Sequence, residues 1–207
     1  MSSTTFWYIT RASGVVALVL LTATMVLGLT TTTRARTRNW PGFARQELHR
    51  RISIISVVFL AIHVLTSVLD TYVHIGWLAL VVPFTSRYSP FWVGMGAIAL
   101  DLMIAVFVSS LFRTRIKPGT WRGIHWLAYG SWPVALAHTF GLGTDAGEHW
   151  VIALGAVCVL SVGAALVLRL RSVAKHTAAL AAVSVDAVPA TRLALTSTSR
   201  GTRHDHQ

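Results

Sequence analysis

The chain has 207 residues, of which 54% are hydrophobic and 12% are charged. Soluble domains usually carry about 25% charged residues, so this composition excludes an ordinary soluble protein and indicates one embedded in membrane lipid. The net charge of +11 lies in short basic clusters between apolar runs, which is typical of loops beside a membrane and argues against a nucleic-acid partner. The one cysteine, Cys158, lies inside an apolar run, so we interpret it as a packing residue.

The first apolar run, residues 12–30, follows a short segment that contains Phe6, Trp7, Tyr8 and Arg11. Aromatic side chains favour the membrane interface, so this segment is expected to anchor the chain at one surface. A cleaved signal peptide is the alternative interpretation. Such a peptide has a basic start, which is missing here, and an apolar core of only about 7–15 residues. We therefore favour a retained membrane helix.

Basic residues gather in three segments of the chain. Residues 31–51 contain six arginines and a single acid, Glu47. Cytoplasmic loops are enriched in arginine and lysine, so this segment is expected on the cytoplasmic side, with the N-terminus outside. The clusters in residues 113–122 and 169–175 fall on that same side if each long apolar run crosses the bilayer once.

Four further apolar runs approach the length of about 20 residues that a membrane-spanning helix needs. They are residues 52–69, 92–112, 124–142 and 150–168. Residues 75–84 are too short and end near Pro83, so we expect an interfacial or re-entrant segment there. The prediction is an all-α integral membrane protein of the cell membrane, with a bundle of about five transmembrane helices, or six, in residues 1–171. Residues 172–207 are expected to form a cytoplasmic tail that is largely disordered.

Two pairs of histidines belong to the second and fourth of the five expected crossings, residues 52–69 and 124–142, with His49 just before the first of these two runs. One pair is His49 and His63, and the other is His125 and His138, whose spacing is shorter by one position. Either spacing covers about 20 Å of helix. Both crossings run outward, so we expect His49 beside His125 near the cytoplasmic face and His63 beside His138 nearer the outer face. A histidine inside a membrane usually marks a functional site, and neutral imidazole is an axial ligand for haem iron. The alternative is that all four are packing residues.

Helical phase gives a further expectation about these pairs. The spacing of His49 and His63 returns to within about 40° of the starting face, so both share one face of a helix. The spacing of His125 and His138 misses by about 140° in an ideal helix, so the helix that carries them must be kinked or unwound. Pro133 lies between them, as does Gly130, and a proline inside a helix bends it.

Two stretches, LHRRISIISVVFLAIHVLT and WRGIHWLAYGSWPVALAHTFGLGTD, resemble the haem-binding helices of the ferric reductase-like transmembrane domain family, and TRASGVVALVLL resembles the opening helix of its bacterial members. The family includes the membrane core of NADPH oxidases and ferric reductases. The resemblance covers about residues 7–170. It implies two b-type haems that carry electrons across the membrane, with His49, His63, His125 and His138 as the axial ligands of the iron.

The resemblance has consequences for partners. The segment after the last apolar run is too short for a flavin or nicotinamide domain, and no GxGxxG motif is present. We therefore expect an electron-transfer component with a separate donor, either a flavoprotein or a quinol, and an acceptor protein or small molecule on the outer side. Two alternatives stay open: a quinol-linked cytochrome b subunit, and a non-redox transporter or anchor with structural histidines.

Several charged residues are candidates for secondary roles. Guanidinium groups bind carboxylates well, so arginines near the expected haem depths are candidates to hold haem propionates, although the positive-inside rule explains most of them equally. These are Arg11 on the outer side and Arg45, Arg50, Arg51 and Arg122 on the inner side. Asp101 lies in mid-membrane, where we favour a structural hydrogen bond over a proton relay. Other histidines are expected at the surface: His74, His149, His204 and His206.

Overall fold

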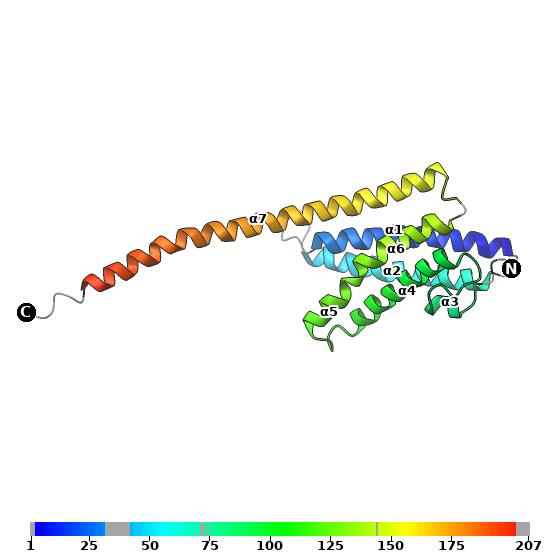
Figure 1. The fold of residues 1–207 in the computed structure, drawn as a ribbon, viewed down its shortest axis with the longest axis horizontal. Coiled ribbons are helices and arrows are strands. Elements are labelled where there is room, and N and C mark those ends of the chain that lie inside the picture. The colour runs from blue at the N-terminus through cyan, green and yellow to red at the C-terminus, as the bar shows by residue number, and fades with distance from the viewer. Residues whose placement is uncertain (1–2, 32–41, 71–72, 74, 144, 202–207) are drawn as a thin grey trace, which may run out of the picture.

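In a computed structural model, the protein is described over residues 3–31, 42–70, 73, 75–143 and 145–201. The described residues form helices and loops without any strand (Figure 1). The helices are α1 (Ser3–Thr31), α2 (Gly42–Leu69), α3 (Leu78–Val81), α4 (Pro90–Leu111), α5 (Pro118–His125), α6 (Leu127–Leu142) and α7 (His149–Gly201). Arg34, Arg36, Arg38, His74, His204 and His206 lie outside the described residues.

Four of the described helices are long and apolar enough to cross a membrane: α1, α2, α4 and the first 27 residues of α7. A helix satisfies its own backbone hydrogen bonds, which is why apolar runs of this length become helices in lipid. The prediction of an all-α membrane bundle is confirmed.

The crossing expected at residues 124–142 differs from the other four because it is divided. α5 ends at His125, and α6 begins after Trp126 and has only 16 residues. The backbone N–H of Trp126 reaches the carbonyl oxygens of both Arg122 and Gly123, at 3.1 and 3.2 Å, so the last turn of α5 is tightened toward 3₁₀ geometry. A tightened turn changes the helical phase after His125.

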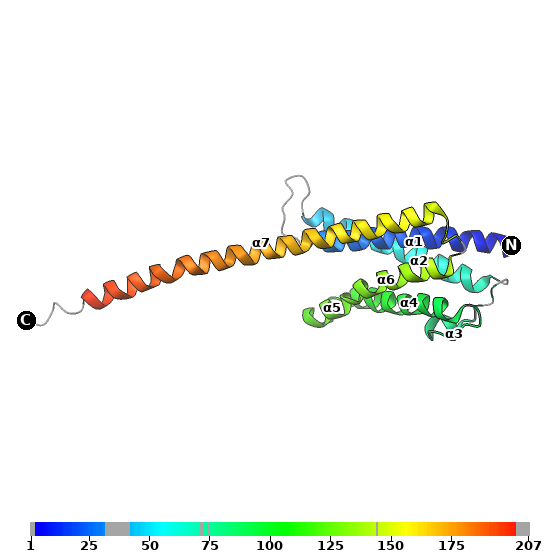
Figure 2. The same ribbon diagram turned by 45° about the horizontal axis from the view of Figure 1, so that its top comes forward.

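The helices lie side by side as two antiparallel pairs, with α7 alongside (Figures 1 and 2). α1 packs along α2, and α4 packs along α6. α1 also contacts α6 and α7, so it joins the two pairs in the bundle. This arrangement brings residues of α2 toward residues of α5 and α6, which are far from them in the sequence.

Most of the described residues between α2 and α4 are exposed, although Ala79 and Ser86 are buried. α3 is a single turn of four residues, and its Leu78 and Val81 are 66% and 68% exposed. Phe84 has a positive φ of 68°, and its ring packs against Gly94 of α4. A four-residue helix is far too short to cross a bilayer, in agreement with the expected interfacial or re-entrant segment.

The centre of the bundle is closed by a small apolar cluster. Leu21 and Met25 of α1 meet Trp132 of α6 and Cys158 of α7 there. The indole N–H of Trp132 donates to the Thr22 hydroxyl at 3.0 Å. Cys158 is 3% exposed and forms part of this core, as the sequence predicted.

The backbone of α7 continues as helix to Gly201, beyond the bundle on the side where α5 lies (Figures 1 and 2). The polar end of the sequence predicts disorder for most of this tail, whereas its backbone is helical as far as Gly201. The alanine-rich composition of residues 174–190 favours a helix, since alanine loses the least free energy on entering one.

Candidate functional site

The four histidines meet as two pairs. The ring centroids of His63 and His138 are 6.3 Å apart, and those of His49 and His125 are 6.4 Å apart. The two rings are inclined by 83° in the first pair and by 67° in the second. All four side chains are partly buried. Each histidine therefore lies beside the partner that was predicted from the shared direction of the two crossings.

On α2 the two histidines repeat one local arrangement. Ser53 lies one turn after His49 and donates its hydroxyl to the His49 carbonyl at 2.6 Å. Ser67 does the same to the carbonyl of His63, also at 2.6 Å. These hydroxyls are satisfied on their own helix, and such bonding is common for serine in apolar helices. His49 and His63 both lie within the continuous helix α2, and helical periodicity places the two imidazoles on nearly the same face.

The second histidine of each pair comes from the divided segment. His125 is the last residue of α5, and His138 lies near the end of α6. The expected distortion between them is present, but the helices divide at Trp126, whereas Pro133 lies inside a continuous α6. The break directly after His125 corrects the mismatch in helical phase, so both histidines face the same neighbour, α2.

Three of the four imidazoles are held through the Nδ1 nitrogen by a backbone carbonyl. His63 bonds Thr10 at 2.9 Å, His49 bonds Thr24 at 3.1 Å, and His138 bonds Trp92 at 2.7 Å. A carbonyl oxygen can only accept, so Nδ1 carries the proton and donates it. The lone pair of Nε2 is then free for a metal, which is the usual arrangement for metal-bound histidine.

Buried polar atoms without a partner gather at the inner pair. Among the described residues, four such side-chain atoms occur. His125 Nδ1 is one, and Trp121 Nε1, on the ring stacked against His125, is another. The third is Arg45 Nε, one turn before His49 on α2, and the fourth is Thr24 Oγ1, whose own carbonyl accepts from His49. An unsatisfied buried polar group is costly, so this region suits a ligand with polar groups.

The pairs fit a haem better than a bare metal ion. Within the described residues no three histidine, cysteine or acidic side chains gather as a metal site, and each pair offers only two nitrogens. Haem iron takes its remaining four ligands from the porphyrin. Two imidazole–metal bonds of about 2 Å each, plus the distance from each nitrogen to its ring centre, set the ring centroids roughly 6 Å apart or slightly more. The observed separations are 6.3 and 6.4 Å.

The predicted arginines occupy different surroundings. Arg11 forms an ion pair with Asp145 and lies over the Trp7 ring at 4.3 Å. Arg50 and Arg51 are exposed and pair with Glu47. The exposed Arg122 donates to the carbonyl of Pro118 on its own helix, at 3.2 Å. None of these four contacts a histidine of the pairs through a described interaction.

Arg45, the fifth predicted arginine, and two further arginines contact residues near the inner pair. Arg45 is partly buried and donates to the carbonyl of Thr30 at 3.2 Å. Arg169 of α7 donates to the Tyr129 hydroxyl at 2.6 Å, one turn after His125. Sequence reasoning left Arg169 out because its place beside α6 depends on how α7 packs. The guanidinium carbon of Arg113 lies 5.8 Å from the centre of the Trp121 ring.

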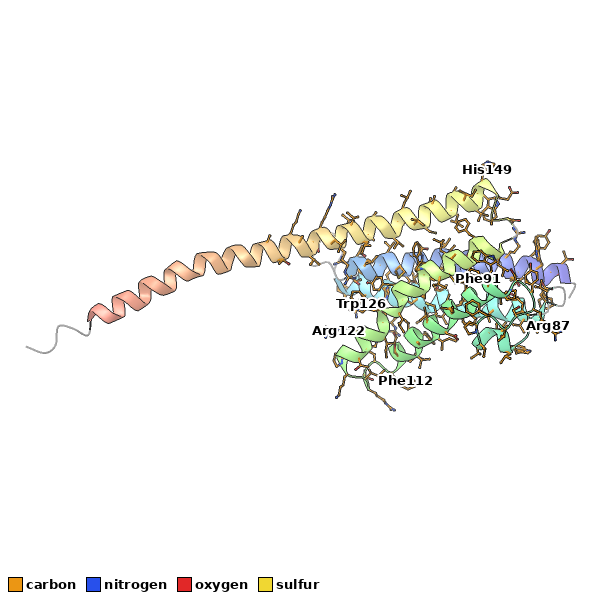
Figure 3. The ribbon with its side chains drawn as sticks, in the orientation of Figure 1. Arg87, Phe91, Phe112, Arg122, Trp126 and His149 are labelled. Carbon is orange, nitrogen blue, oxygen red and sulfur yellow. The ribbon has the colours of Figure 1, made fainter. Side chains whose placement is uncertain are left out.

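Two secondary candidates are less connected to the pairs. Among the described residues, no hydrogen bond or ion pair is found for the side chain of Asp101 on α4, so the structure offers no partner for the structural hydrogen bond expected there. His149 is exposed at the start of α7, as expected for a surface residue. In Figure 3 it lies at the opposite end of the bundle from Arg122.

Comparison with known proteins gives one family. The family described as "Ferric reductase like transmembrane component" matches residues 13–136. This range contains His49, His63 and His125 and ends just before His138. No curated protein and no solved structure gives a significant match.

Proposed function

Because this chain belongs to the ferric reductase like transmembrane component family, and is therefore a multi-pass membrane redox component, we propose that it is a b-type cytochrome with two haems. In this proposal His49 and His125 bind the iron of the inner haem, and His63 and His138 bind that of the outer haem. One observation carries the proposal: the ring centroids of two histidine pairs lie 6.4 and 6.3 Å apart, and both pairs form between α2 and the divided segment of α5 and α6.

Haem supplies one-electron iron chemistry, and an iron with two imidazole ligands has no open position for oxygen, which favours electron transfer. The residues of the chain then have defined tasks. The carbonyls of Thr10, Thr24 and Trp92 fix three of the rings with Nε2 unprotonated. The apolar cluster around Trp132, which lies between His125 and His138 in the sequence, excludes water from the centre of the bundle.

We place the inner haem on the cytoplasmic side of the cell membrane. Basic residues concentrate at that end of the bundle, in residues 45–51, 113–122 and 169–175, whereas acids such as Asp145 and Glu148 lie near the start of α7. By the positive-inside rule the N-terminus is then outside and the C-terminus cytoplasmic. Electrons would enter from a cytoplasmic flavoprotein or a membrane quinol and leave to an acceptor on the outer side.

The decisive experiment is an absorbance spectrum of the purified full-length protein, expressed with adequate haem. We expect reduced b-type haem bands and about two haems per chain, since each histidine pair supplies one complete axial ligand set. A protein that folds and shows no haem bands would refute the proposal and favour a non-redox role for the histidines.

Single histidine variants test the pairing. His63→Ala and His138→Ala should each leave about one haem per chain, and the same single haem, because both remove a ligand of the outer one. The variant that removes both His63 and His138 should lose no more haem than either single variant. His49→Ala combined with His63→Ala should lose both haems. Retention of two haems in His63→Ala would contradict the ligand assignment.

Reduction assays separate the donors. The full-length protein in vesicles is mixed either with a reduced quinol or with a reduced flavoprotein, and haem reduction is followed by absorbance. Rapid reduction by the quinol alone would identify the chain as a quinol-linked cytochrome b subunit.

A further inference from the structure

We propose that Gly14, Gly28 and Gly96 are positioning residues. Each one forms, together with the carbonyl oxygen one helical turn before it, a seat that fixes the orientation and the tautomer of one histidine. This inference rests on the proposed function, because it assigns the free ring nitrogen of each seated histidine to iron.

The seat of His63 lies on α1. Its Nδ1 donates to the carbonyl of Thr10 at 2.9 Å. A Cβ added to Gly14 would lie 2.8 Å from Nδ1 and 2.9 Å from Cε1 of the same ring. Real Cβ atoms do not approach this closely, so the ring occupies the space that a side chain at position 14 would fill.

The seat of His49 repeats this arrangement further along α1. Nδ1 of His49 donates to the carbonyl of Thr24 at 3.1 Å, and the nearest ring atom lies 3.4 Å from the Cβ position of Gly28. The interval from Gly14 to Gly28 on α1 equals the interval from His49 to His63 on α2. Because the two helices are antiparallel and share this interval, a contact made once recurs at the second histidine.

The seat of His138 lies on a different helix, α4. Its Nδ1 donates to the carbonyl of Trp92 at 2.7 Å, and a Cβ on Gly96 would lie 2.6 Å from its Cε1. The same one-turn offset between carbonyl and glycine therefore occurs three times, on two helices that hold opposite sides of the site.

The physical reason is the geometry of a helix. Residues i and i+4 lie on the same face, one turn apart, and the carbonyl of residue i already accepts the N–H of residue i+4. A carbonyl has two lone pairs, so it can accept a second bond from outside the helix. A side chain at i+4 stands beside that second direction of approach, and glycine removes it.

His125 has no such seat. No glycine follows Gly96 on α4, and the equivalent depth further along that helix is occupied by Ser109 and Ser110. Both hydroxyls donate to the carbonyl of Val106, at 2.9 and 2.7 Å. Nδ1 of His125 is buried and has no partner in the part of the chain that the structure describes, and the ring of His125 stacks on Trp121 instead. The outer pair thus has two seated histidines and the inner pair has one.

The test compares glycine variants of the full-length protein. Gly14→Ala and Gly96→Ala should each weaken binding of the outer haem by about 10–100-fold, the usual effect of disturbing the groups that orient a metal ligand. Gly28→Ala should have a smaller effect on the inner haem, because its Cβ position is 3.4 Å from the His49 ring. Haem content and the electron paramagnetic resonance of the ferric protein are measured, since the latter reports how the axial rings are oriented.

Two further variants are the matched controls. Gly163→Ala introduces a Cβ into open space, and Gly155→Ala introduces one against the ring of Phe140, which belongs to neither pair. Both controls should keep two haems and the wild-type resonance. The inference is overturned if Gly14→Ala and Gly96→Ala behave like Gly163→Ala, or if Gly155→Ala causes the same loss and the same spectral change.

A measurement without haem separates this inference from the proposed function. In the haem-free chain, the ¹⁵N resonances of the histidine rings should show His49, His63 and His138 protonated at Nδ1, and Gly14→Ala should alter one ring, that of His63. If the wild-type protein binds no haem, the proposed function fails. The ring resonances of the haem-free chain still test whether each glycine orients its histidine. If the ring resonances of His63 do not change in Gly14→Ala, the proposed role of the glycine seats is refuted.

Discussion

The imidazole of His125 stacks on the indole of Trp121, with ring centroids 5.1 Å apart and the planes 26° from parallel. Both rings carry a buried nitrogen that has no partner among the described residues. The other three histidines of the pairs are instead held by a carbonyl. The inner and outer pairs are therefore alike in separation but differ in how their histidines are oriented.

Replacing Trp121 should affect the inner haem alone. Aromatic stacking contributes about 0.5–1.5 kcal/mol, so Trp121→Leu should weaken binding of one haem by roughly 2–13-fold. Trp121→Phe keeps a ring and should stay close to wild type. Haem titration of the two variants measures the difference. Equal haem affinity in Trp121→Leu and the wild type would show that the stacking does not orient His125.

Arg45 should matter more than its exposed neighbours. Its Nε, one turn before His49, is buried without a partner among the described residues, and under the proposed function a carboxylate of the inner haem binds there. A hydrogen bond to a charged group contributes about 1.5–3 kcal/mol, so Arg45→Gln should weaken binding of the inner haem by roughly 10–100-fold. Arg50→Gln is the matched control, because that side chain is 74% exposed. The haem content of both variants is compared at limiting haem. An equal loss of haem in Arg45→Gln and Arg50→Gln would show that the positive charge of this region matters and that a specific bond from Arg45 does not.

Arg11 should act through Asp145. This ion pair joins α1 to the connection between α6 and α7, and its side chains are 29% and 30% exposed. Partly exposed pairs contribute up to about 1 kcal/mol, so Arg11→Gln and Asp145→Asn should lower thermal stability slightly and by similar amounts. The exchanged variant, Arg11→Asp with Asp145→Arg, should recover part of the lost thermal stability. A changed outer-haem spectrum in Arg11→Gln, with none in Asp145→Asn, would instead favour the propionate role that the sequence suggested.

The bond between Trp132 and Thr22 should stabilise the bundle. Thr22→Val keeps the shape but leaves the buried indole N–H unpaired, which costs about 1–3 kcal/mol. Thr22→Ser retains the hydroxyl and is the control. Thermal unfolding in detergent measures both variants. Combining Thr22→Val with Trp132→Phe should cost less than the sum of the two single changes, because the donor and acceptor are lost together.

Cysteine labelling tests the orientation in the membrane. His149 and Arg122 lie at opposite ends of the bundle (Figure 3). In a background with Cys158→Ala, a membrane-impermeant maleimide should label His149→Cys in intact cells and Arg122→Cys only after permeabilisation, because basic clusters remain cytoplasmic. The reverse labelling pattern would invert the proposed direction of electron flow.

Much of this protein follows from its sequence alone. Long apolar runs must become helices in lipid, since no other backbone arrangement within a single span satisfies its hydrogen bonds. The spacing of His49 and His63 places both on one face by helical periodicity. The pairing of His63 with His138 follows from counting crossings, because two helices that run in the same direction bring equivalent positions to the same depth.

Tertiary structure decided the finer features. Pro133 was the expected cause of distortion, but the helices divide at Trp126, because the final turn of α5 tightens through bonds to two carbonyls. Arg11, a candidate to bind a haem propionate, forms an ion pair with Asp145, and the position of Asp145 depends on how α7 returns to the bundle. The seats at Gly14, Gly28 and Gly96 require two helices in contact at a fixed register. A glycine in the sequence indicates only that no side chain occupies that position. Which histidine ring fills the space depends on the helix that packs against it.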